Sequence, residues 1–144
     1  MKIKYGEIEF CSKWLLEHLA LAGKKSRMRV RLIEILGEHQ AKFEKFRMDL
    51  IKEHARLDEN GDIVVVDRDE NGSGQADIID PEAFRSDLQE LLLEEFVVEE
   101  SETNREMLLV MKECVDECPV AWSGQAALEY EAVCRLFEGI YQNE

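Results

Sequence analysis

The sequence predicts a mainly α-helical protein with a small β-hairpin, an α+β fold of about five helices, one of them long, in a single domain 1–144. Apolar residues recur at three- and four-residue spacing over most of the chain, as in amphipathic helices. A β-branched run at residues 63–66 stands between two copies of the turn-forming sequence Asp-Glu-Asn-Gly. With 144 residues, 45% of them hydrophobic, the chain can bury a core without metals or disulfides. We expect a helical hairpin with the long helix (1–57), the β-hairpin (58–80) and an acidic helical part (81–144).

The first part should contain two helices. One covers residues 7–22 and ends at Gly23, and Ser26 then caps the long helix, which runs to Leu57. The apolar residues of the long helix follow coiled-coil-like steps of three and four: Leu32, Leu36, Phe43, Phe46, Leu50 and Leu57. Such a stripe needs a partner helix, from this chain or from a second copy.

The middle of the chain should form the hairpin, with strands at residues 63–66 and 75–79. Asp80 then caps a helix at residues 81–95, whose first position is a proline. We expect residues 96–98 to form a short strand that joins the hairpin.

Two helices should complete the chain. Thr103 and Glu106 have the spacing of a reciprocal capping box, which predicts the start of the fourth helix. That helix stops before Pro119, because the residue before a proline disfavours helical geometry. Ser123 caps the last helix.

The charge is distributed unevenly. The chain has 18 basic and 32 acidic residues, a formal net charge of −14. Residues 1–23 are neutral, residues 24–56 carry +5 and residues 57–144 carry −19. This asymmetry predicts internal electrostatic pairing or an oriented surface for a partner.

Two charged clusters are the candidate interaction surface. The basic cluster at the start of the long helix consists of Lys24, Lys25, Arg27, Arg29 and Arg31. A helix N-terminus with such residues would suit a phosphate, but the field of the whole protein repels nucleic acid, so we favour salt bridges within the chain or between subunits. The acidic cluster consists of Glu94, Glu95, Glu99, Glu100 and Glu102. We favour a solvated helix face for it. The alternative is mimicry of nucleic acid, in which carboxylates at phosphate-like spacing occupy a nucleic-acid-binding site on another protein.

Metal binding has weak support. Asp67, Asp69, Asn71 and Gly72 match the first half of a calcium loop, but Ile78 stands where the bidentate glutamate belongs, so an acidic hairpin turn is favoured. The cysteines offer a second arrangement, because Cys114 and Cys118 lie four apart and Cys134 or Cys11 could complete a zinc site. Cysteine is also a common core residue, and we favour packing. We therefore expect no metal and no cofactor.

The sequence gives no sign of an enzyme or of a membrane protein. It contains no glycine-rich phosphate loop, serine elbow or helical zinc-protease motif. His18, His39 and His54 share no motif with a carboxylate or nucleophile, which favours surface or boundary positions. No apolar run approaches the roughly 20 residues of a membrane span, and the N-terminus lacks the order of a signal peptide. We expect a non-enzymatic protein of the cytoplasm.

Three stretches of the chain resemble a family of uncharacterised small proteins from phages and prophages of Gram-positive bacteria. They are residues 19–31, residues 57–63 together with 80–84, and residues 123–130 leading into 136–138. The family has no assigned activity or catalytic residues. What the resemblance implies is a phage context and the host cytoplasm as location.

The combined expectation is a phage or prophage accessory protein that acts through protein–protein interaction, in particle assembly. Its partner would be a phage structural protein or a host protein, and the long helix at residues 26–57 could also form a homo-oligomer. The alternative is an acidic inhibitor of a host defence or nucleic-acid-binding protein. A metal-binding protein or enzyme is the third hypothesis. Direct binding to nucleic acid or membrane is not expected.

Overall fold

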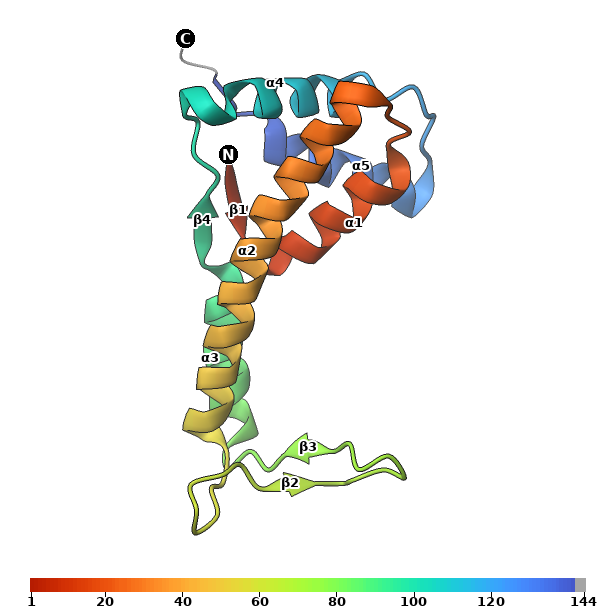
Figure 1. Ribbon diagram of the computed structural model, residues 1–144. Helices are drawn as coiled ribbons and strands as arrows, with labels where there is room; N and C mark the ends of the chain where they lie inside the picture. Colours follow the sequence, from red (N-terminus) through yellow and green to blue (C-terminus); the bar gives the residue numbers. More distant parts are fainter. Residues whose placement is uncertain (142–144) are drawn as a thin grey trace. The chain divides into compact units, whose positions relative to one another are not determined.

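The structure is a computed structural model that describes residues 1–141; residues 142–144 of the expected acidic part lie outside the described residues. It confirms a mainly α-helical fold with five α-helices in the described chain, one of them long, and two small antiparallel strand pairs (Figure 1). The chain divides into two compact units. Unit 1 contains residues 1–40 and the chain from Glu95 onward, and unit 2 contains Ala41–Glu94. Helix α2, Gly23–His54, contributes residues to both.

Unit 1 contains a two-stranded sheet that was not predicted from the sequence. Strand β1, Lys2–Lys4, pairs antiparallel with β4, Glu95–Val97, and Ile3 lies opposite Phe96. Our expectation that residues 96–98 join the hairpin was therefore wrong. Each strand carries one large apolar residue between charged or exposed neighbours, and pairing buries Ile3 and Phe96 together at 1% and 8% exposure.

The first two helices differ from expectation at their ends. A short 3₁₀ helix η1, Tyr5–Glu7, leads into α1, Ile8–His18, which ends four residues before the expected position. The reason is that Leu19 is extended and that Arg29 of α2 donates from Nη1 to the carbonyl oxygens of Leu15, at 3.3 Å, and of Leu19. Helix α2 begins at Gly23, whose positive φ of 58° suits glycine, rather than after Ser26.

The last two helices complete unit 1. Helix α4, Glu102–Asp116, is capped by Ser101, whose Oγ accepts from the Asn104 amide at 3.2 Å, so the expected cap at Thr103 was wrong. Helix α5, Gly124–Phe137, follows Ser123 at the N-cap position, although the Ser123 side chain makes no capping hydrogen bond. The Tyr130 hydroxyl donates to the Val115 carbonyl at 2.7 Å and so joins α5 to α4.

Unit 2 consists of the C-terminal part of α2, the hairpin of β2 (Val65–Val66) and β3 (Gln75–Ala76), and α3, Pro81–Leu93. The hairpin is confirmed, with Val65 opposite Ala76. The two Asp-Glu-Asn-Gly sequences form the same turn. Asp58 and Asp69 each accept two backbone amides on Oδ1, and each turn ends in a glycine with a φ of 80°.

The two units bury very different amounts of apolar surface. Of the 23 buried hydrophobic residues in the described part of the chain, twenty form the core of unit 1, and the three in unit 2 are Phe43, Ala55 and Leu91. The stripe of α2 shows the same contrast, since Leu32 and Leu36 are fully buried whereas Phe46 is 43% exposed. Helix α2 ends at His54, so Leu57 leaves the stripe and forms an isolated bridge with Ile63.

Replacing Ile3 with alanine should destabilise unit 1. The side chain is 1% exposed, and truncation of a buried isoleucine costs about 2–4 kcal/mol in lost transfer energy and cavity formation. Urea unfolding followed by circular dichroism measures the change. Val97→Ala is the control, because Val97 lies in the paired strand but is 51% exposed. Equal losses for both variants would contradict the assigned register.

The Cys11 thiol should resist alkylation in the native protein. It is fully buried in α1, and burial raises its pKa to about 12, so only about one thiol in ten thousand is ionised at pH 8. We expect iodoacetamide to modify the half-buried Cys118 first and Cys11 only after addition of denaturant, as read by mass spectrometry. Early modification of Cys11 would contradict the packing of α1.

Candidate functional site

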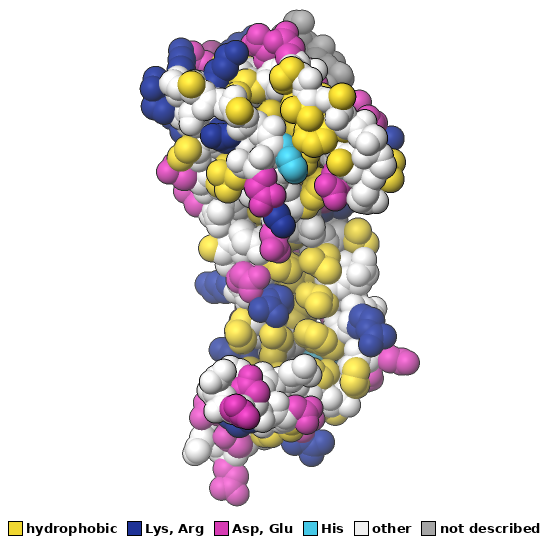
Figure 2. All heavy atoms as spheres, turned by 90° about the vertical axis from the view of Figure 1, so that its right-hand side faces the viewer, with side chains coloured by type: hydrophobic (Ala, Val, Ile, Leu, Met, Phe, Trp, Pro, Cys, Tyr) yellow, Lys and Arg dark blue, Asp and Glu magenta, His cyan; other side chains and the backbone are white. Residues whose placement is uncertain are grey.

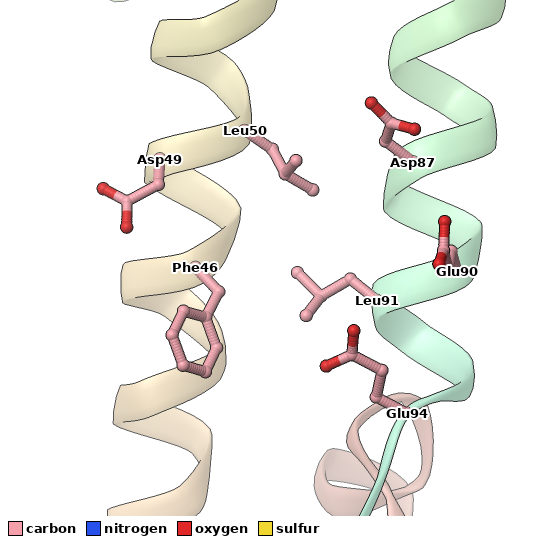
Figure 3. Close-up of a pocket in the computed structure, with 7 residues that line it drawn as sticks. All are labelled: Phe46, Asp49, Leu50, Asp87, Glu90, Leu91 and Glu94. Carbon is pink, nitrogen blue, oxygen red and sulfur yellow. The ribbon is translucent and has the colours of Figure 1, made fainter.

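The candidate site is a groove in unit 2 with an apolar floor and an acidic rim. It has a volume of about 420 Å³ and is lined by Phe46, Asp49 and Leu50 of α2, by Asp87, Glu90 and Leu91 of α3, and by Glu94. Figure 3 shows Leu50 and Leu91 pointing toward each other between the two helices, with the Phe46 ring beside them. Asp49 points outward from α2, and Glu94 reaches toward α2.

Local sequence signals position the residues of α3. Asp80 accepts from the amides of Glu82 and Ala83 at 3.2 Å each, and Pro81 occupies the first turn, so the start of the helix is fixed. Counted from Asp87, the groove residues of α3 and Glu94 follow at steps of three, one and three. This spacing places them on one side of the helix.

Carboxylates are the only charged groups that line the groove. Asp87 contacts His54 of α2, with 2.6 Å between Oδ2 and Nε2. Within residues 1–141, Asp49, Glu90 and Glu94 have no hydrogen-bond or ion-pair partner for their side chains. Three unpaired carboxylates around an apolar floor produce a local negative potential that favours a cationic partner.

The His54–Asp87 pair also marks the only group of described residues that could hold a metal ion. One ligand atom each from Glu53, His54 and Asp87 lie within 4.8 Å of one another. The direct contact between His54 and Asp87 already satisfies both groups and joins α2 to α3. His54 also packs edge-on against Phe84, with 5.8 Å between ring centroids. The pair therefore has a structural role without any ion.

The residues of the basic cluster make different contacts and have different structural roles. Lys24 forms an exposed ion pair with Glu106, which agrees with the expected salt bridges. Arg29 is half-buried and binds the carbonyl oxygens at the end of α1, so its role is to cap a helix rather than to meet an anion. Lys25, Arg27 and Arg31 are exposed, and the described chain gives their side chains no ion-pair partner.

The residues of the acidic cluster are divided between the two units. Glu94 lies on the rim of the groove in unit 2, whereas Glu95 belongs to β4 of unit 1. Glu100 accepts from the Tyr141 amide at 2.9 Å and lies 3.8 Å from the Met1 amino group, so it is occupied within unit 1. The backbone carbonyl of Glu99 accepts from the Asn104 side chain at 3.0 Å.

The other candidate motifs have structural roles. The calcium-like sequence forms the turn between β2 and β3, with Asp69 bound to the amides of Asn71 and Ser73, as the acidic-turn interpretation predicted. The cysteines form no group of three metal ligands among the described residues. All three histidines are half-buried, as expected, but the pairing of His54 with Asp87 was not.

Unit 1 has a larger groove of about 560 Å³ between α1 and α2, lined among others by Leu16, Ile33 and Gly37. Its charged lining residues are of both signs, Glu9 and Glu17 together with Lys13. The groove of unit 2 is the stronger candidate because its charges have one sign and because the unit around it buries few apolar residues.

Phe46 and Leu50 of the floor were predicted as parts of an apolar stripe, but three of the four rim carboxylates, Asp49, Asp87 and Glu90, were not predicted. The available signal was the position of Asp87 and Glu90 within one turn of Leu91. Asp49, from another helix, could be assigned to the same groove only with the fold known.

No helix of the described chain combines the length and apolar character needed to cross a membrane. No protein-family model matches the sequence, and neither a curated protein nor a solved structure shows significant similarity to it.

Removing the Asp87 carboxylate should increase local opening of α3. Asp87→Ala leaves the half-buried His54 without its partner, which costs about 1 kcal/mol. We expect faster hydrogen exchange at the α3 amides, with amides of unit 1 unchanged. Glu90→Ala is the matched control, because Glu90 lies on the same helix and rim but has no partner in the described chain. Equal exchange rates in the two variants would show that the pair does not stabilise unit 2.

Proposed function

We propose that this chain is a non-enzymatic accessory protein of a phage or prophage that acts by binding another protein through unit 2. The observation that carries the proposal is the incomplete burial of unit 2. Only three of its hydrophobic residues are buried, and Phe46, Leu57, Ile79 and Leu93 are each at least 43% exposed. Figure 2 shows one face of the molecule, on which hydrophobic side chains reach the surface along unit 2.

The physical argument is that an amphipathic helix is stable in water only when its apolar side is covered. In unit 2 only α3 and the hairpin are available to cover the apolar side of α2, whereas globular domains bury apolar faces between packed layers around one core. Contiguous exposed apolar patches mark protein or membrane interaction sites, ligand-binding grooves or aggregation-prone surfaces. A protein partner would supply the missing layer and gain roughly 25 cal/mol for each Å² of apolar surface it covers.

The phage context comes from the sequence resemblance and suggests two kinds of partner. A structural protein of the particle would make the chain an assembly factor. A basic host protein would make it an inhibitor, and the acidic rim of the groove supports this second candidate.

The test is capture of partners with the tagged full chain from cells that express it naturally, followed by mass spectrometry. Phe46→Ser should abolish recovery of the main partner, because Phe46 forms the floor of the groove. Met48→Ser should leave recovery unchanged. Met48 lies on the same helix and is also 43% exposed, but it does not line the groove.

The recovered proteins then separate the two candidates. Phage structural proteins would support assembly, and one stoichiometric host protein released by salt would support inhibition. If both variants recovered the same partners as the wild type, binding through the groove of unit 2 would be ruled out.

A further inference from the structure

We infer that the groove of unit 2 accepts a basic amphipathic helix of another protein, with apolar side chains on the floor and Lys or Arg against the rim. This inference rests on the proposed function and specifies the chemistry of the partner. It also gives a role to the unpaired carboxylates, which the burial argument alone leaves unexplained.

The shape of the groove suits a helix. Its walls are two adjacent helices, and its floor is formed by Phe46, Leu50 and Leu91. The rim extends over seven residues from Asp87 to Glu94. At the rise of an α-helix this is about 10 Å, or two turns. A partner helix can therefore place two or three apolar side chains, at positions i, i+3 or i+4, and i+7, into the groove.

The rim determines the charge of the partner. Asp49 comes from α2 and points outward from it, Glu90 comes from α3, and Glu94 follows α3 and reaches toward α2, so both helices beside the floor contribute carboxylates. A helix seated between them meets negative charge on each side of its apolar stripe. Lys or Arg on both flanks would form ion pairs, whereas Asp or Glu there would be repelled.

The same charges argue against a second copy of this chain as the occupant. In a symmetric dimer through this groove, each acidic rim would face its own equivalent. Both copies would also carry a formal net charge of −14. Like-charge contact of this kind opposes self-association, so the occupant is a heterologous basic helix.

The experiment uses three synthetic 18-residue peptides and the full chain. The first has leucines at helical spacing flanked by lysines, the second has the same composition with the spacing scrambled, and the third has glutamates in place of lysines. Binding is followed by fluorescence anisotropy at physiological salt. We expect the first peptide to bind, the scrambled peptide to bind much more weakly and the acidic peptide not to bind.

Two variants with equal loss of charge test the site. The groove variant carries Asp49→Asn, Glu90→Gln and Glu94→Gln, and leaves Asp87 in place to preserve its contact with His54. The control variant carries Glu59→Gln, Glu70→Gln and Glu82→Gln, exposed residues of unit 2 outside the groove. We expect the dissociation constant to rise about tenfold in the groove variant and to stay near the wild-type value in the control.

Three outcomes would overturn the inference. One is equal affinity for the amphipathic and scrambled peptides, which would mean that net charge alone drives binding. Another is equal weakening in the two variants. The third is a dimer in analytical ultracentrifugation that Phe46→Ser abolishes, which would make the occupant a second copy. Failure of this inference can be distinguished from failure of the proposed function. If the basic peptide did not bind but Phe46→Ser still abolished recovery of a natural partner, the inference would fail and the proposed function would stand.

Discussion

The apolar stripe of α2 must be kept from water along the whole helix, and both units are built around it. A 32-residue helix presents this stripe to both units, and each unit covers it differently. In unit 1, Leu32 and Leu36 are fully buried in a core built from the other helices. In unit 2, a single helix and a hairpin leave Phe46 partly in water. The candidate site is therefore a consequence of how much chain is available to cover α2.

Unit 2 is inserted into unit 1 in sequence, because unit 1 takes its residues from both sides of residues 41–94. The pairing of β1 with β4 joins these two sides, and Arg29 joins α2 to the end of α1. Unit 1 thus has its own core and its own polar contacts. This separation means that the surface of unit 2 can change without loss of the main hydrophobic core.

The sequence predicted the elements with strong local signals. The hairpin followed from the repeated turn sequence, α3 from Asp80 and the proline after it, and the long helix from its apolar spacing. Contacts distant in sequence were not predictable. A three-residue strand such as β1 has no periodicity, and its partner lies more than 90 residues away. Arg29 looked like part of a basic surface because its hydrogen bonds to α1 depend on the fold. For the same reason Asp49, which comes from another helix than Asp87 and Glu90, could be assigned to the rim of the groove only with the fold known.

The pairing of Lys2 with Val97 also has a consequence for synthesis on the ribosome. The ribosome adds roughly 5–20 residues per second, so β4 is synthesised roughly 5–20 s after β1. During this time Ile3 has no strand to cover it, whereas the hairpin of unit 2 needs only neighbours close in sequence. Contacts between close neighbours form faster than distant ones. The nascent chain would therefore organise unit 2 first and complete the larger core of unit 1 last.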